Sequence, residues 1–347
     1  SLAHGTGDGT LAGLLRIVLR HRVTGCRRRP AVHLLPILMI LMVRKIVLSI
    51  AFLSGLLLLD RAVGTAMRAA YERTFTGEAG GQINDALRHS DSDFVIFGSS
   101  LARHQVDPGV LEAQLGVSAF NAGCNGQDIY YARMLQSLLL QRDCKCSHFV
   151  YVLNWRDLVQ DELDRARMFS VFADDSITIR QILAPSLVQQ VKLQSRAYRF
   201  NTLAVSTLRQ LIAPDFEGTA GFVRILVDYQ PVARDFRDMD RDLHAGLSAG
   251  ELSIMAKKLQ YYRDFSLAAK RRGIAVTFVV SPTFRAGRDR GPGECLAVER
   301  LIAVAADTQA NFIVLDETTV PAFRDVSYYG DPRHLNAGTV EIGRAHV

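Results

Sequence analysis

The sequence of 347 residues predicts an α/β fold, in which helices cover both faces of a mostly parallel β-sheet. Three observations lead to this expectation. Short apolar segments of strand length recur along the chain. Segments of helical length and apolar spacing lie between them. The short segments are almost continuously apolar, as strands are when both faces of a parallel sheet are covered.

Five segments fit such strands, and two of the helices between them have clear signals. Asp107 and Pro108 are typical of the cap and first position of a helix over 107–116. Residues 128–141 form an apolar helix. Apolar residues recur every three or four positions from 252 to 265, and 296–308 is a further helix. The expected strands are 93–97 (DFVIF), 117–121 (VSAFN), 148–154 (HFVYVLN), 274–280 (IAVTFVV) and 312–316 (FIVLD).

Residues 156–250 interrupt this alternation. They contain helical pieces (SLVQQVKLQSRAYRFNTLAVSTLRQLI) and a charged stretch (DYQPVARDFRDMDRD) that a sheet core cannot absorb. We interpret them as a cap inserted into a domain that covers 91–340. Such an insertion shapes a pocket without supplying its chemistry.

The N-terminal region predicts membrane targeting. The basic pair Arg44 and Lys45 precedes fourteen mostly apolar residues (IVLSIAFLSGLLLL, 46–59). This is the layout of a signal peptide or an uncleaved signal anchor, which we place at 42–66. The alternative is a buried core helix. Basic residues stay in the cytoplasm, so we expect the inner membrane of a bacterium, a stalk at 67–90, and a domain in the periplasm or outside the cell. Cleavage of the signal would give a secreted protein.

Both ends of the chain look unlike folded structure. Residues 1–41 have no regular apolar period, and we interpret them as a non-native upstream extension or a cytoplasmic segment. The last seven residues, EIGRAHV (341–347), match the translation of a common sequencing adapter, and we exclude them from the fold.

The charge distribution argues against a nucleic-acid partner. Residues 1–45 hold eight Lys or Arg against one acid, so the formal net charge of +6 comes from this end of the chain. The rest has no basic surface to bind phosphates. Five cysteines without repeating spacing do not suggest a disulfide framework. No second cluster joins Cys144, Cys146 and His148, so we expect no metal there and no cofactor elsewhere.

Polar residues follow the predicted strands where each one ends. Ligands of parallel α/β folds bind at this edge of the sheet. Ser99 and Ser100 follow the first strand, the stretch from Asn121 to Gly126 follows the second, and Asn154 ends the third. Near the end of the chain, Asp331 stands three residues before His334.

These residue types suit attack on an ester. A serine hydroxyl needs a base within hydrogen-bond reach, and a histidine held by a carboxylate supplies one. The oxygen that becomes negative in the transition state needs N–H donors, which a glycine turn and an amide side chain provide. Each element alone is common: a Gly-Ser-Ser turn or a helix cap is the ordinary alternative. Their joint order is more specific.

This order resembles the SGNH/GDSL hydrolase superfamily, over about 91–154 and 325–340. Gly98-Ser99-Ser100 stands in place of Gly-Asp-Ser, and Val152-Leu153-Asn154-Trp155 departs from the usual Gly-x-Asn-Asp. The resemblance implies a flavodoxin-like three-layer sandwich, with Ser100, His334 and Asp331 catalytic and with Ser100, Gly126 and Asn154 forming the oxyanion hole. It is nearest in pattern to membrane-anchored bacterial members.

Three functions fit this resemblance. The first is a serine esterase that acts outside the cytoplasm on an acylated small molecule or glycan. The second uses the same triad as an O-acyltransferase that modifies a cell-envelope polysaccharide. The third is a non-catalytic envelope protein that keeps the fold for binding or assembly. The presence of Ser100, Asp331 and His334 favours the first two.

Overall fold

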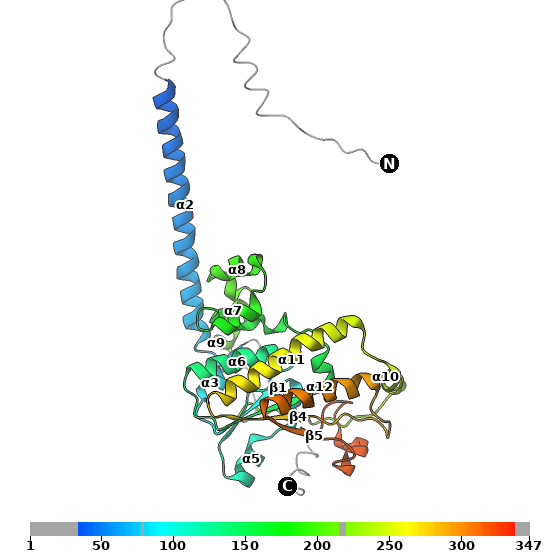
Figure 1. Ribbon diagram of the computed structural model, residues 1–347. Helices are drawn as coiled ribbons and strands as arrows, with labels where there is room; N and C mark the ends of the chain where they lie inside the picture. The colour runs from blue at the N-terminus through cyan, green and yellow to red at the C-terminus, as the bar shows by residue number, and fades with distance from the viewer. Residues whose placement is uncertain (1–33, 78–79, 215–219, 337–347) are drawn as a thin grey trace, which may run out of the picture. The chain divides into compact units, whose positions relative to one another are not determined.

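The computed structural model describes residues 34–77, 80–214 and 220–336 (Figure 1). Most of the predicted segment 1–41 and all of 341–347 lie outside these residues. The chain divides into two units, Ser1–Leu58 and Leu59–Val347, and the second holds the sheet.

Five parallel strands form one sheet in the order β2-β1-β3-β4-β5. The predicted α/β class with a parallel sheet is therefore confirmed. The carboxyl end of β1 lies between those of β2 and β3, so the polar residues that follow these three strands are neighbours. The strands are β1 (Phe94–Gly98), β2 (Ala119–Asn121), β3 (His148–Leu153), β4 (Ala275–Val280) and β5 (Asn311–Val314).

Helices cover both faces of the sheet, and one layer is much thicker than the other. The connection from β1 to β2 runs in one direction along the sheet and the later connections run in the other. Right-handed crossovers therefore place their helices on opposite faces. The main core lies on the face of α6, α11 and α12, where Phe97, Tyr151 and Phe278 are fully buried. A smaller cluster around Ile96 lies beneath α4 on the other face. The helices are α3 (Gly81–Arg88), α4 (Ser100–Gln105), α5 (Pro108–Leu115), α6 (Ile129–Gln141), α11 (Ala249–Lys270) and α12 (Pro292–Thr308).

The apolar N-terminal segment belongs to one long helix, α2 (Leu34–Tyr71). Its stretch Met39–Tyr71 is long and apolar enough to cross a membrane, and an 18-residue window within it has a mean hydropathy of 2.1. The helix begins before the predicted segment 42–66 and continues past Asp60 and Arg61.

Residues 67–90 differ from the expected stalk, because they pack into the folded unit. Tyr71 is fully buried and donates its hydroxyl to the carbonyl of Gly80 (2.6 Å). In α3, Ile83, Ala86 and Leu87 are buried in the main core. Their spacing of three and four residues puts them on one helical face. The short apolar stripe in a polar sequence explains why the segment reads as a stalk and folds as part of the domain.

The inserted segment 156–250 has two parts with different places in the fold. The first part packs on α6 and buries Phe169 and Phe172 in the main core. The second part, 220–244, lies along the carboxyl ends of the strands: the Val223 N–H donates to the carbonyl of Arg103 (3.1 Å), and the Tyr229 N–H to that of Tyr329 (2.7 Å). Only this second part has the place expected of a cap.

The remaining helical elements are short. Those of the insertion are η1 (Trp155–Leu158), η2 (Arg165–Phe172), α7 (Ile177–Leu183), α8 (Leu187–Gln194), η3 (Tyr198–Phe200), α9 (Ala204–Ile212) and α10 (Ala233–His244). Two further turns, η4 (Pro321–Arg324) and η5 (Val326–Tyr328), precede the loop that carries Asp331 and His334.

Candidate active site

Ser100 stands at the turn from β1 into α4, and the two neighbouring serines have different tasks. Ser99 is the N-cap of α4, because its Oγ accepts the N–H of Leu101 (3.4 Å). Ser100 is the first residue of the helix and its side chain is half-buried. Gly98 makes the turn possible: its φ is 144°, and a Cβ there would lie 2.2 Å from the carbonyl oxygen of Val152.

The structure brings Ser100, His334 and Asp331 together in one chain of hydrogen bonds. His334 Nε2 lies 2.6 Å from Ser100 Oγ, and His334 Nδ1 lies 2.7 Å from Asp331 Oδ2. Ser100 and His334 are 234 positions apart in sequence. An Nδ1–H donated to the carboxylate leaves Nε2 as an acceptor for the serine proton, which is the arrangement of a general base.

Asp331 is fixed by its own loop. Its Oδ1 accepts the N–H groups of Arg333 (2.8 Å) and His334 (3.0 Å). Burial raises the pKa of Asp331, but the hydrogen bonds from His334 and from the two backbone N–H groups outweigh it, so the pKa lies below its usual value. The carboxylate therefore stays ionised and orients the imidazole over a wide pH range.

Two residues of α4 that sequence reasoning missed support this loop. Gln105 donates from Nε2 to the carbonyl of Arg333 (2.7 Å) and accepts from the Ser281 hydroxyl. The ring of His104 lies 6.0 Å from that of His334, and its Nδ1 lies 2.6 Å from the carbonyl of Val223. Burial lowers the pKa of His104 and favours its neutral form. Both side chains follow Ser100 by about one helical turn, which is the signal that could have revealed them.

The three predicted oxyanion residues line one cavity of about 190 Å³ with His334. The N–H of Ser100 has no acceptor within its helix, because it belongs to the first turn. Gly126 has a φ of 64°, and a Cβ there would lie 1.9 Å from the Arg165 guanidinium. The turn therefore favours glycine strongly.

Asn154 is buried at the carboxyl end of β3, with a side chain that already has two partners. Its Oδ1 accepts the N–H of Arg156 (3.1 Å), and its Nδ2 donates to the Thr283 hydroxyl (2.8 Å). An amide nitrogen carries two hydrogens, so one remains for an oxyanion. Asn154 is also the N-cap of η1.

A buried ion pair connects the loop that carries Gly126 with the loop that follows Asn154. Lys258 of α11 is fully buried, and its Nζ lies 2.6 Å from Asp128 Oδ2. The same ammonium donates to the carbonyl of Asp157 (2.6 Å). Asp128 follows Gly126 by two residues and Asp157 follows Asn154 by three. Lys258 therefore helps to fix the separation of these two loops.

A larger cavity of about 600 Å³ also borders His334 and extends to α10. Its wall is mainly charged, and several of its arginines are paired with acids, as Arg156 is with Asp242 and Arg285 with Glu294. Trp155 adds the single indole of the chain. Arg333 borders both cavities. A wide polar cavity with one aromatic face suits a polar, extended ligand.

Within 34–77, 80–214 and 220–336, no group of three or more His, Cys, Asp or Glu side chains is arranged to hold a metal ion. Cys144 and Cys146 are free, the first half-buried and the second buried.

No protein-family model matches the chain, and no curated protein matches it. Among solved structures, it is similar to the crystal structure of NADH-dependent reductase A1-R′ complexed with NAD, at 14% identity over 66% of this chain and 96% of that one. The TM-score of 0.20 is too low to carry an argument about fold or function.

Proposed function

We propose that the protein is a serine ester hydrolase of the SGNH type that acts outside the cytoplasm on an acylated carbohydrate. The observation that carries the proposal is the hydrogen-bonded chain Ser100–His334–Asp331, with distances of 2.6 and 2.7 Å, at the carboxyl ends of the strands. The cavity shared by Ser100, Gly126 and Asn154 supports it, because donors are needed there for the carbonyl oxygen.

In this proposal, Ser100 Oγ attacks the ester carbonyl while its proton passes to His334 Nε2. The N–H groups of Ser100 and Gly126, with Asn154 Nδ2, stabilise the negative oxygen of the tetrahedral intermediate. The C–O bond to the alcohol then breaks, and the alcohol leaves with the proton from His334. Water, deprotonated by His334, attacks the acyl-serine and releases the acid and free Ser100.

Acyl transfer is the second candidate, and the larger cavity favours it. His334 and Asp331 line this cavity, which holds about 600 Å³. A glycan hydroxyl that entered from there would meet His334, lose its proton to Nε2 and take the acyl group in place of water. The polar wall suits a sugar acceptor of a cell-envelope polysaccharide.

We further propose that α2 is retained as a single membrane anchor in the inner membrane of a bacterium, with the domain on the periplasmic side. The contacts of its last turns support retention over cleavage: Tyr71 is fully buried, and Arg68 donates to the carbonyl of Val171 (2.5 Å). A signal peptide that is removed has no such role in the folded domain.

The test is hydrolysis of an aryl acetate and labelling by a fluorophosphonate, on the full chain in detergent. Ser100→Ala should abolish labelling and lower kcat/KM by about 10⁴-fold. Ser99→Ala is the matched control, because it removes a neighbouring hydroxyl that has only a capping role, and it should still be labelled. Turnover that persists in Ser100→Ala would refute the proposal. Labelling without hydrolysis, with acyl groups passed to an added oligosaccharide, would favour transfer.

A further inference from the structure

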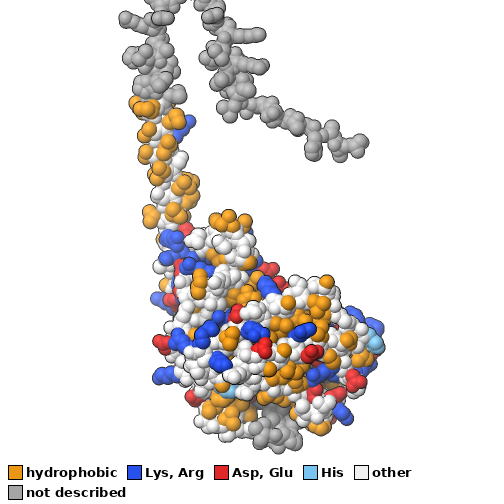
Figure 2. Space-filling view, viewed as in Figure 1, with side chains coloured by type: hydrophobic (Ala, Val, Ile, Leu, Met, Phe, Trp, Pro, Cys, Tyr) orange, Lys and Arg blue, Asp and Glu red, His pale blue; other side chains and the backbone are white. Residues whose placement is uncertain are grey.

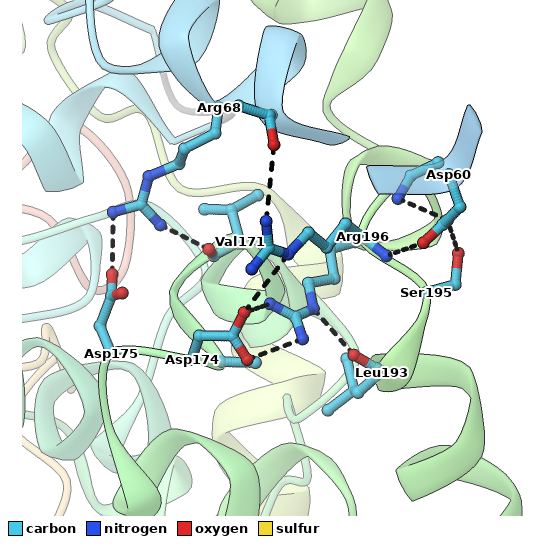
Figure 3. A network of polar contacts seen from close by, with 12 residues as sticks. Asp60, Arg68, Val171, Asp174, Asp175, Leu193, Ser195 and Arg196 are labelled. Atoms are coloured by element: carbon cyan, nitrogen blue, oxygen red, sulfur yellow. Dashed lines mark hydrogen bonds and ion pairs between the residues drawn. The ribbon is translucent and has the colours of Figure 1, made fainter. Parts of the chain in front are cut away.

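A polar clamp joins the end of the apolar run in α2 to the segment that follows α8 (Figure 3). The Asp60 carboxylate accepts the N–H groups of Arg196 (2.9 Å) and Ala197 (3.0 Å), and it also accepts the hydroxyl of Ser195. Gly64 lets the two backbones approach, because a Cβ there would lie 2.3 Å from the Arg196 Cβ. The C-terminal end of α8 therefore lies beside Asp60.

Arg68 makes two further contacts that extend the clamp along the last turns of α2. The Arg68 guanidinium binds the carbonyl of Val171 (2.5 Å) and the carboxylate of Asp175 (2.8 Å). Next to it, Asp174 accepts two hydrogen bonds from the buried Arg199 (2.6 and 2.9 Å). Figure 3 shows these groups as one network between α2 and the insertion. The network holds the first part of the insertion against the last turns of α2.

Helix α8, which the clamp holds beside α2, has an exposed apolar face. Leu187, Val188 and Val191 of α8 are 73%, 64% and 63% exposed. Their positions i, i+1 and i+4 lie within about 100° of the helix circumference. Figure 2 shows hydrophobic side chains gathered on the outer end of this helix. A capping box between Ser186 and Gln189 fixes its first turn.

A cationic group lies at the border of this face. Lys192 belongs to the same helix and follows Val191 directly. Lys192 Nζ lies 5.9 Å from the centroid of the Tyr198 ring. An apolar stripe with a cation at its border matches the acyl chains and the anionic headgroups of a bilayer surface.

We propose that α8 lies in the interface of the bilayer that α2 crosses, with Leu187, Val188 and Val191 among the acyl chains and Lys192 at the headgroups of anionic phospholipids. The occupant follows from continuity: uncharged residues 46–59 precede Asp60, and the clamp puts the end of α8 beside Asp60. This inference rests on the proposed role of α2 as an anchor.

The test uses tryptophan as a depth reporter, because the chain has one native Trp. The full chain is reconstituted in nanodiscs of phosphatidylglycerol with brominated acyl chains, which quench nearby indoles. Val188→Trp adds a second indole to the protein. In the brominated lipid, most of the emission from this added indole should be quenched. Val227→Trp is the matched control: Val227 is equally exposed at 65%, lies in the second part of the insertion, and should not be quenched. Phe52→Trp, within the apolar run of α2, reports on the anchor.

The outcomes separate the two proposals. The inference is supported if the indoles of both Phe52→Trp and Val188→Trp are quenched. Quenching of Val188→Trp should then be lost when Asp60→Ala is added and opens the clamp. Quenching of Phe52→Trp without Val188→Trp overturns the interfacial role of α8 and leaves the anchor intact. If neither indole is quenched, the anchor proposal fails as well. Equal quenching in brominated phosphatidylcholine would overturn the preference for anionic lipid.

Discussion

Lys258→Met tests the ion pair between Lys258 and Asp128. Methionine keeps a similar unbranched length and removes the ammonium. Lys258 is fully buried and Asp128 is 2% exposed in its side chain, so the Asp128 carboxylate would be left without its cation in a dry environment. Loss of one partner of such a pair costs about 3–5 kcal/mol. The carbonyl of Asp157 loses its donor as well, which adds about 1–3 kcal/mol.

The measurement is urea unfolding of the full chain in detergent, followed by the fluorescence of Trp155. The free energy of unfolding should fall by about 4 kcal/mol, near the lower end of these costs, because the loop can relax. Burial already raises the pKa of Asp128, so its carboxyl can take a proton when Lys258 is absent. The loss should therefore be smaller at pH 5 than at pH 8.

The double variant Lys258→Met with Asp128→Asn provides the control. It removes both charges, and its free energy of unfolding should exceed that of Lys258→Met alone. The surviving fold of the double variant then allows the esterase assay, where kcat should stay below wild type because the two loops lose their common tie. A Lys258→Met variant within about 1 kcal/mol of wild type would refute the assignment of a stabilising buried pair.

Three further variants test the site. Asp331→Asn should lower kcat by about 10³–10⁴-fold with little change in KM, because the imidazole loses the carboxylate that sets its tautomer; an unchanged kcat would remove Asp331 from the triad. Gly126→Ala should lower kcat by about 10²-fold, since the φ of 64° disfavours alanine and displaces an oxyanion donor; Gly246→Ala, where a Cβ meets nothing within 4 Å, is the control. Burial raises the pKa of Asp157 from 3.8 to about 6, so between these pH values the folded state holds a proton that the unfolded state has lost. The free energy of unfolding should therefore fall by about 3 kcal/mol as pH rises from about 4 to 6. Asp157→Asn should flatten this part of the pH profile in urea unfolding, and a profile identical to wild type would refute the assignment.

The sheet and the candidate triad could be predicted from the sequence for the same physical reason. Strands buried on both faces are almost continuously apolar, so their ends are visible as the first polar residues, and Ser100 and Asn154 are such residues. Parallel strands bring their carboxyl ends to one edge, so the residues after them meet. His334 could be paired with Asp331 because three residues separate them within one loop.

The supporting residues could not be predicted, because their roles depend on contacts that no local pattern records. Lys258 lies on a helix whose spacing shows only which face is apolar, and its partners Asp128 and Asp157 are more than 100 residues away in sequence. The place of 67–90 was missed because Ile83, Ala86 and Leu87 form too short a stripe to stand out in a polar segment. The division of 156–250 into two parts follows from which core residues, such as Phe169, find a partner on α6.

The insertion gives the domain two properties at once. Its first part, through Ser195 to Ala197, fixes α8 beside α2, and its second part forms a wall of the larger cavity through α10. Both parts lie between β3 and α11 in the sequence. Asn154 follows the last residue of β3, and Lys258 belongs to α11. If α8 lies in the bilayer interface, as proposed, the proposed reaction takes place at the membrane surface. Turnover of a membrane-bound acylated glycan should then depend on Leu187, Val188 and Val191, whereas turnover of a soluble aryl acetate should not.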